Sequence, residues 1–389
     1  MGTSHLSDEQ IEELMVRYYA GDDVAELIKE FRLCITPGRI YTLFPPIVRE
    51  DLNCCPYCII HLIQKRVSKS AVRTGYEIPS PHCTSCGHKA SSSCKCSNCL
   101  AEKERLVKLQ ESELQERLSS IAYDQREDQV STEQLSLKEA IDLVSLSRAG
   151  REEDSDKIKS IVEFDLPAGP TLEYTIESIK HLYKRKLINI APGNPLECFS
   201  FKNRKVEPVE FKNIHWKFRL GKNQAESIES IYDLDACLHD MDKWPADWKH
   251  ELYNVWMILA LHENLKYLEV ILVDHNFIPR IGDKTKRTLI SLLHSFSISQ
   301  SYTFIWSSVR SAAAYFQRGN ISRQRAANTI IGKCQITAER ALCEDWDVKK
   351  YRRDYRCIES ISSSLFANVV AGIGEDFFNK KPFDFFDTL

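Results

Sequence analysis

The chain contains no long hydrophobic run. No stretch of about 18 uncharged apolar residues occurs in its 389 residues, which argues against a membrane-spanning helix. The first ten residues, MGTSHLSDEQ, contain neither the basic segment nor the apolar segment of a secretory signal. Lys and Arg number 52 against 55 Asp and Glu, so the formal net charge is only −3. We therefore expect a cytoplasmic protein with no membrane partner.

Several catalytic signatures are missing as well. The sequence has no phosphate loop GxxxxGK[ST], no dinucleotide-binding GxGxxG, no GxSxG and no HExxH. Four aspartates surround a Trp-Pro break but do not follow strand ends, where a metal-dependent nuclease would need them, so we interpret them as part of a solvated loop. They are Asp233, Asp235, Asp240 and Asp242. The sequence therefore favours a protein that is not an enzyme.

Cysteine, in contrast, is abundant, and eight of the 14 cysteines lie between Cys54 and Cys99. In a secreted chain such a number would indicate disulfides, but in a reducing compartment clustered cysteines indicate a metal site. The stretch HCTSCGHKASSSCKCSNC, residues 82–99, has almost no apolar side chain. Hydrophobic burial cannot order it, so metal binding would have to replace the missing core.

Two Cys-x-x-Cys pairs, CPYC at 55–58 and CTSC at 83–86, are separated by 24 residues. A gap of two residues lets one tight turn present two thiolates to the same ion, and four thiolates complete a closed, structural zinc site. The pairs resemble the two knuckles of a zinc ribbon. This resemblance implies a metal but no particular partner, since ribbons bind DNA, RNA and proteins. Its ligands would be Cys55, Cys58, Cys83 and Cys86.

Three more cysteines follow and need a fourth ligand, which His88, His82 or Cys54 could supply. They are Cys94, Cys96 and Cys99. We favour His88, so that the chain would hold one or two structural zinc ions. The alternatives are that some of these cysteines are free thiols or exchange with the first site, or that iron and sulfur are bound, although paired knuckles favour zinc.

Three short helices are predicted before the cysteines. Ser7 and Gln10 form a capping box for the first helix, which Gly21 ends, and a second helix follows. Thr36 followed by Pro37 predicts the start of a third helix that reaches residue 44.

These three helices resemble the helix-turn-helix of resolvases and transposases. The resemblance covers about 40 residues and implies DNA contact by Arg39 and Thr42, with Tyr41 beside them. A helix-turn-helix next to a zinc ribbon resembles the N-terminal part of some mobile-element proteins. The alternative is that the helices form only a packing module.

The middle of the chain predicts a helix, then a hairpin of two short strands around the turn PGNP at residues 192–195. The stretch TIESIKHLYKRKLI resembles the third helix of winged-helix domains, which bind DNA or protein partners. Residues 214–220, IHWKFRL, alternate and predict a half-buried strand with a basic outer face. The expected nucleic-acid contacts here are Lys180, Lys184, Arg185, Lys217 and Arg219.

From Ala225 onward the periodicity predicts helices. Charge is unevenly distributed: residues 101–157 contain 15 acidic and 9 basic residues, whereas residues 280–356 contain 15 basic and 6 acidic residues. The basic region is compatible with a nucleic-acid-binding surface, although solvated helix faces would show the same balance.

One enzyme alternative rests on Arg287 and His294, which lie on one predicted helix. The pair resembles the Arg and His of HEPN ribonucleases, all-helical proteins in which these groups polarise the scissile phosphate and move protons. Seven positions span nearly two helical turns, so both side chains could face one groove. The alternative is a solvated arginine and an ordinary histidine.

The sequence therefore predicts a mainly α-helical, multidomain protein with small β elements. The expected parts are a helix-turn-helix-like module (1–48), a zinc ribbon (49–100), a helical connector and linker (101–134), a winged-helix-like domain (135–222) and an α-helical domain (223–389). We expect a zinc-containing, nucleic-acid-binding protein, with DNA as the favoured ligand and an association with mobile elements or defence. The alternatives are a HEPN-like ribonuclease effector and a zinc-stabilised scaffold that binds protein partners.

Overall fold

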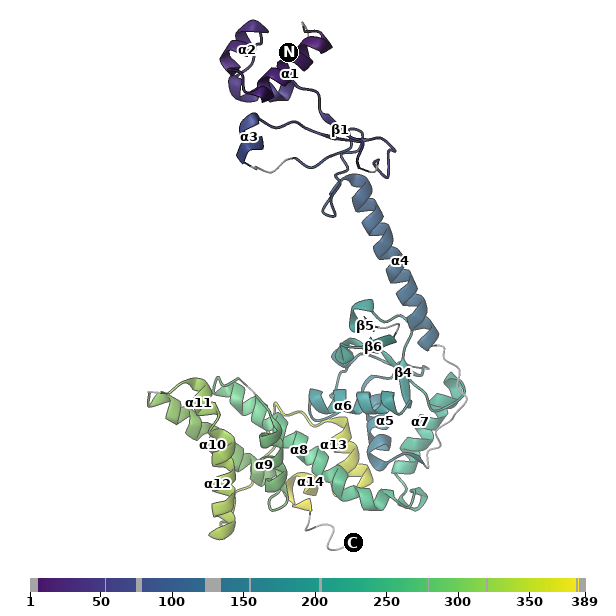
Figure 1. Cartoon of the computed structure of the whole chain (residues 1–389). Coiled ribbons are helices and arrows are strands. Elements are labelled where there is room, and N and C mark those ends of the chain that lie inside the picture. The colour runs from purple at the N-terminus through teal and green to yellow at the C-terminus, as the bar shows by residue number, and fades with distance from the viewer. Residues whose placement is uncertain are drawn as a thin grey trace. The chain divides into compact units, whose positions relative to one another are not determined.

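The computed structural model describes residues 6–52, 54–74, 79–122, 134–153, 155–202, 205–278, 280–319, 321–382 and 384. Over these residues the chain is mainly α-helical with small antiparallel sheets, as predicted (Figure 1). It divides into two compact units, Met1–Glu113 and Leu114–Leu389, which are described separately. The linker predicted over 124–134 lies, except for Gln134, outside the described residues.

The first unit begins with the helices α1 (Asp8–Ala20) and α2 (Val24–Glu30). The capping box between Ser7 and Gln10 is present, and Gly21 ends α1 with φ 112°. The two helices and the segment after them enclose a small separate core. Its buried residues are Leu14, Tyr18, Leu27, Phe31, Leu33, Ile40 and Phe44.

The third helical segment differs from the prediction. It is a 3-10 helix, η1 (Pro37–Leu43), and the Thr36 side chain makes no capping hydrogen bond. Pro37 occupies the first turn, as expected. A 3-10 helix has three residues per turn, so its side chains at i and i+3 lie above one another. This geometry buries Ile40 and packs Tyr41 partly against the core.

Residues 47–100 of the first unit are called the metal module below. Strand β1 (Ile47–Arg49) pairs with β2 (Leu62–Gln64), and single bridges join Ile63 to His82 and His82 to Lys89. Helix α3 (Lys69–Thr74) lies between these segments, and α4 (Ser97–Ala122) begins directly after Cys96.

The second unit begins with α5 (Leu137–Gly150), whose predicted capping box between Ser136 and Glu139 is present. Further along the chain lie β3 (Lys157–Ile158), η3 (Ile161–Glu163), α6 (Leu172–Lys184), β4 (Ile188–Ile190), η4 (Leu196–Cys198), β5 (Phe199–Lys202), β6 (Lys205–Pro208), η5 (Phe211–Asn213) and β7 (Trp216–Phe218). Three strands form one antiparallel sheet in the order β3-β7-β4, and β5 pairs with β6 in a hairpin.

The strands on either side of residues 192–195 do not pair with each other, in contrast to the prediction. Strand β4 pairs with β7, and β5 pairs with β6. The reason lies in Asn194, which is buried in the turn. Its amide donates to the Ala191 and His215 carbonyls, and its Oδ1 accepts from the His215 N–H, so the turn is fixed to the segment that leads into β7.

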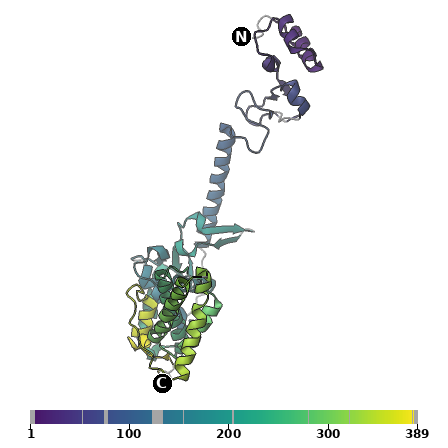
Figure 2. The same cartoon turned by 90° about the vertical axis from the view of Figure 1, so that its left-hand side faces the viewer.

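The rest of the second unit is helical. Its elements are α7 (Gln224–Leu238), η6 (Met241–Lys243), α8 (Trp248–Asp274), α9 (Asp283–Leu293), α10 (Ile298–Gln317), α11 (Arg323–Ala327), α12 (Ile330–Cys343), α13 (Ile361–Leu365), the π-helical η7 (Phe366–Val370) and α14 (Asp376–Asn379). Helix α8 is buried on most sides, and α10 packs against both α8 and α12 (Figures 1 and 2).

One continuous hydrophobic core runs through the second unit. It includes Trp216 and Phe218 of the sheet as well as Trp256 and Phe366 of the helices, so side chains on both sides of position 222 share it. None of the helices in the described ranges is long and apolar enough to cross a membrane.

Candidate metal centres and charged surfaces

The metal module gathers Cys55, Cys58, Cys83 and Cys86 into one group. Their sulfur atoms lie within 4.8 Å of one another, so a single metal ion could contact all four. Cys55 and Cys83 are buried, and Leu62 is the one non-cysteine residue in this small buried cluster. The four cysteines come from two separate turns, which β2 and the bridge between Ile63 and His82 hold together.

Both turns use the same backbone hydrogen bonds. The N–H four residues after the first cysteine donates to that cysteine's carbonyl, in Ile59 to Cys55 (2.9 Å) and in Gly87 to Cys83 (3.0 Å). The N–H of the first cysteine donates to the carbonyl five residues later, in Cys55 to Ile60 and in Cys83 to His88. Gly87 and Ile59, the residues that follow the two Cys-x-x-Cys motifs, both have positive φ, 69° and 55°. Glycine adopts this conformation without strain, but a β-branched isoleucine does so rarely.

A second group consists of His88, Cys94, Cys96 and Cys99, whose ligand atoms also lie within 4.8 Å of one another. The His88 Nδ1 atom is 3.2 Å from the Cys99 sulfur. Cys96 immediately precedes α4 and Cys99 lies in its first turn, where the helix dipole favours negative charge. This group could therefore hold a second metal ion.

The two groups are joined by Tyr57 and His88. Tyr57 lies inside the first Cys-x-x-Cys turn, and its hydroxyl donates to the Cys99 sulfur of the second group (3.4 Å). This hydrogen bond raises the pKa of Tyr57 to about 12. The His88 carbonyl accepts from the Cys83 N–H, while its ring belongs to the second group. Sequence reasoning did not single out Tyr57, although its place between two candidate ligands was a usable signal.

The backbone around each group favours ionised sulfur. The Cys86 N–H, 3.5 Å from the Cys83 sulfur, lowers the pKa of that thiol to about 7. The Lys89 N–H, 3.2 Å from the Cys94 sulfur, lowers the pKa of Cys94 to about 6. The His88 N–H also acts to lower the pKa of Cys86, but burial and the neighbouring sulfurs outweigh it and raise that pKa to about 12. In the second group the Tyr57 hydrogen bond acts to lower the pKa of Cys99, but burial and the neighbouring sulfurs outweigh it and raise that pKa. Without a metal, each group therefore holds both a readily ionised thiol and a protonated one.

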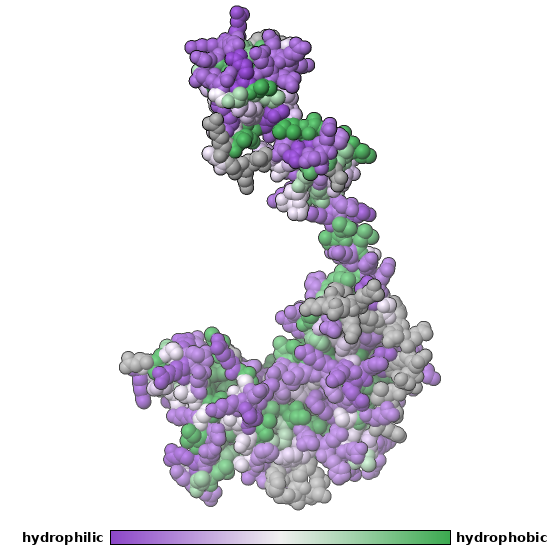
Figure 3. All heavy atoms as spheres, viewed as in Figure 1, coloured by the Kyte–Doolittle hydropathy of each residue, from purple (hydrophilic) through white to green (hydrophobic). Residues whose placement is uncertain are grey.

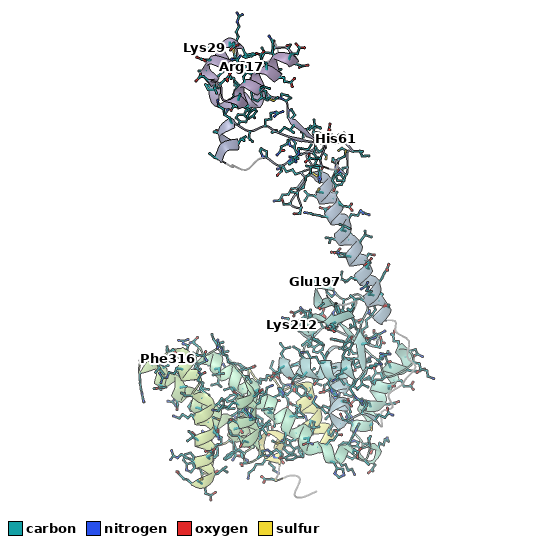
Figure 4. All side chains as sticks on the ribbon, in the orientation of Figure 1. Arg17, Lys29, His61, Glu197, Lys212 and Phe316 are labelled. Carbon is teal, nitrogen blue, oxygen red and sulfur yellow. The ribbon has the colours of Figure 1, made fainter. Side chains whose placement is uncertain are left out.

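The other two candidates for the fourth ligand lie elsewhere. His82 uses its backbone to bridge Ile63 and Lys89. The Cys54 sulfur is 3.7 Å from Nδ1 of His61, which is labelled in Figure 4.

The residues expected at the helix-turn-helix surface are exposed. Arg39 and Thr42 lie on η1, and the Thr42 hydroxyl donates to the Arg39 carbonyl (2.8 Å). The Arg39 side chain is therefore the more available polar group of the two. Both belong to the first unit, as does the metal module.

The basic residues predicted on α6 have different environments. Lys180 lies over the Phe211 ring (5.0 Å), and Arg185 donates to Glu139 (2.9 Å). Lys184 is exposed. Arg185 is thus engaged within the fold, since Glu139 is almost completely buried and also contacts His181.

The strand predicted over 214–220 alternates as expected, with Ile214, Trp216, Phe218 and Leu220 buried. Lys217 and Arg219 lie half-buried on the opposite side. His215 is bonded to Glu163 (2.6 Å), and the hydrogen bonds from Ser160 and His215 lower the pKa of Glu163 to about 2.

Arg287 and His294, the alternative catalytic pair, are both exposed on the surface of α9. The Arg287 side chain donates to the Asp283 carbonyl (3.4 Å), and His294 Nδ1 lies 3.0 Å from the Tyr253 hydroxyl. Each group thus has its own partner, and seven residues of helix separate them by about 10 Å.

Of the four aspartates interpreted as part of a solvated loop, Asp233 and Asp235 instead lie within α7, and Asp235 pairs with Arg148.

No known family model, curated protein or solved structure matches this chain.

Proposed function

We propose that this protein is a zinc-containing, nucleic-acid-binding protein, with DNA as the favoured ligand, in which two zinc ions order the metal module. The donor atoms support zinc. One group offers four thiolates and the other three thiolates and one imidazole, and both sets match closed tetrahedral zinc sites. Zn–S bonds of about 2.3 Å place two sulfurs about 3.8 Å apart, close to the 3.6 Å between Cys55 and Cys86.

The observation that carries nucleic-acid binding is the positive charge of the metal module. Residues 47–100 contain seven Lys or Arg and three Asp or Glu. Lys65, Lys89 and Lys95 are exposed, and none of them forms an ion pair with a described residue. Lys89 follows His88, and Lys95 lies between Cys94 and Cys96, so metal binding would fix both backbones. A rigid positive surface of this kind suits the phosphate backbone.

The topology of the second unit gives independent support. Helix α6 leads into β4, the β5–β6 hairpin follows, and β7 returns to the centre of the sheet β3-β7-β4. A helix followed by an antiparallel sheet with a projecting hairpin is the arrangement expected of a winged helix. In this proposal, Lys184 of α6 and Arg39 of η1 add phosphate contacts to those of the metal module.

Salt dependence tests this proposal. We expect the triple variant K65Q/K89Q/K95Q to bind a DNA duplex more weakly and with a smaller salt dependence. Each lost phosphate contact lowers the slope of log K against log salt concentration by roughly 0.9, so the triple change should lower it by roughly 2–3. Fluorescence anisotropy of a labelled 20-base-pair duplex at several salt concentrations measures both quantities.

The matched control is the variant K159Q/K222Q/K249Q, which removes the same charge from three exposed lysines of the second unit. Its slope should equal that of the unchanged protein. Equal slopes for both triple variants would show that the metal module makes no phosphate contacts, and absence of binding at low salt would end the proposal.

A second candidate function, docking of a protein partner, is favoured by exposed apolar side chains on the metal module (Figure 3). Ile59 is 82% exposed and Val48 52%, and Tyr57, Ile60 and Ile47 are also exposed. Ile59 also has the unfavourable positive φ noted above. A side chain that makes few packing contacts and strains the backbone adds little to the stability of the fold. It is better explained as part of a surface that binds a partner.

The substitution Ile59→Gly tests this interpretation of Ile59. Glycine adopts positive φ without strain, so we expect the metal module to become more stable by about 1 kcal/mol. The reciprocal substitution Gly87→Val should destabilise it by a similar amount, since no atom approaches the added Cβ and backbone strain is the main effect. Resistance of the bound metal to a chelator measures both. A less stable Ile59→Gly variant would mean that Ile59 serves the fold, which would remove the reason for a docking surface.

A further inference from the structure

Residues 346–356, WDVKKYRRDYR, follow α12 without forming a helix or strand and lie along α10. We call this segment the basic strap. The Tyr351 N–H donates to the Ser299 carbonyl (3.0 Å), and the Thr303 hydroxyl donates to the Lys349 carbonyl (2.6 Å). The strap is thus held by its backbone. Arg353 and Arg356 are engaged in ion pairs within the fold, whereas Lys349, Lys350 and Arg352 form no ion pair with a described residue.

Cations and aromatic rings alternate across the strap and the adjoining face of α10. The Arg310 guanidinium lies 5.0 Å from the centre of the Trp306 ring, and Lys349 Nζ lies 5.8 Å from that of Tyr351. The Trp306 and Tyr351 rings are themselves 6.0 Å apart. Ser299, Thr303, Trp306 and Arg310 recur every three or four residues, so they share the α10 face along which the strap runs.

Two hollows flank the strap. The first, of about 490 Å³, is lined by Trp346 and Lys349 of the strap and by Thr303 and Ser307 of α10, among others. The second, of about 700 Å³, includes Tyr351 and the cations on either side of it in sequence. Volumes of several hundred Å³ are those of small-molecule sites, and each hollow places an aromatic ring beside at least one cation.

The strap keeps an excess of positive charge. It contains five basic and two acidic residues. Lys349, Lys350 and Arg352 are exposed, whereas Asp347, Glu359 and Glu375 line the hollows with opposite charge. Several nearby carboxylates are paired: Asp354 with Arg356, Glu263 and Glu359 with Arg353, and Glu344 with Arg340. Asp345, next to Trp346, is exposed.

We propose that the basic strap and the adjoining face of α10 form a binding site for single-stranded nucleic acid. The inference rests on the proposed nucleic-acid-binding function and assigns it a second, distinct surface. Single strands expose the flat faces of their bases, and proteins bind them by stacking those faces on aromatic side chains along a positive groove. Trp346, 42% exposed in the first hollow, and Tyr351 in the second would receive bases, while Lys349, Lys350 and Arg352 contact phosphates.

A duplex offers the same phosphates but keeps its bases stacked inside, so it cannot use the rings. The comparison between strands and duplex therefore separates stacking from simple charge attraction. Fluorescein-labelled dT20, rU20 and a 20-base-pair DNA duplex serve as probes for the full-length protein, with anisotropy as the readout.

The first variant is R310Q/K349Q/R352Q, which removes three exposed cations while the backbone bonds of the strap remain. We expect it to bind dT20 or rU20 roughly tenfold or more weakly and the duplex less than about twofold more weakly. The second variant, Trp346→Leu, keeps an apolar side chain and the charge but removes the ring. It should weaken single-strand binding without changing the salt slope. The K159Q/K222Q/K249Q variant is the control and should bind single strands normally.

If both strap variants bind single strands as tightly as the unchanged protein, this inference is wrong. Duplex binding by the same variants would then show that the proposed function still holds. An equal loss for strands and duplex would identify the strap as a general phosphate contact and also overturn it. If the unchanged protein binds none of the three probes, both proposals fail. A stronger effect on dT20 or on rU20 identifies the natural ligand as DNA or RNA.

Discussion

Elemental analysis of the purified protein should find close to two zinc ions per chain, and Cys86→Ser should abolish the first site and unfold the metal module. This module has very little other support: its buried cluster contains Cys55 and Cys83 but only one residue that is not cysteine, Leu62. Binding of a structural zinc ion contributes on the order of 10 kcal/mol, far more than one leucine can replace. Metal content and protection of backbone amides from hydrogen exchange measure the two effects.

The control for this substitution is Cys34→Ser, since Cys34 is exposed and belongs to neither group. It should retain both ions and the fold. A Cys86→Ser variant with an ordered metal module, or an unchanged protein that is ordered without metal, would contradict the zinc assignment.

We expect acid to release the metal, because protons and metal compete for the same sulfur atoms. A metal binds thiolate, so it must displace the protons that the free groups hold, including the one on Cys86, whose pKa is raised to about 12. Metal affinity therefore falls as the pH falls, because protons then compete for the sulfurs. Zinc release measured with a chromogenic chelator should increase steadily from neutral toward acidic pH.

The second large effect is expected at a buried ion pair in the second unit. Glu263 of α8 is completely buried, and its carboxylate accepts hydrogen bonds from Arg353 and from the Ser363 hydroxyl (2.7 Å). Arg353→Met would leave this carboxylate without its cation. Removing one partner of a buried pair typically costs about 3–5 kcal/mol. Urea unfolding should show this loss as a lower midpoint for the second unit.

Two variants serve as controls for Arg353→Met. Arg340→Met removes a mostly exposed partner of Glu344 and should cost at most about 1 kcal/mol. The double variant E263L/R353M removes both charges and should recover most of the stability, because no buried charge is then left unpaired. If Arg353→Met lowers the free energy of unfolding no more than Arg340→Met does, then water reaches Glu263 and Arg353, in contrast to what the burial of Glu263 indicates.

Features that depend on a few neighbouring residues could be predicted well. The capping boxes at Ser7 and Ser136 and the end of α1 at Gly21 follow from side chains and backbone groups only three or four residues apart. The third helix was predicted less well, because Thr36 and Pro37 permit a 3-10 helix as readily as an α-helix. Local sequence specifies where a helix begins better than how tightly it winds.

The Cys-x-x-Cys spacing likewise determined the first candidate metal group, since covalent spacing limits which sulfurs can meet. For the second group it gave three cysteines, and only the structure placed His88, rather than His82 or Cys54, beside them. The spacing did not reveal that Tyr57 bonds to Cys99 across 42 residues, or that Ile59 takes a strained conformation. Those depend on how the two turns face each other. The residue pattern identified candidate ligands, and the fold brought the two groups together.

By itself, then, the sequence determined the helical character, the caps and seven cysteines of the two candidate metal groups, because each is specified by short-range spacing. Only the tertiary structure decided that β4 pairs with β7, that Arg353 neutralises Glu263 90 residues away, and that the basic strap lies along α10. Such contacts depend on which distant surfaces exclude water together. In a single sequence, no local pattern encodes that choice.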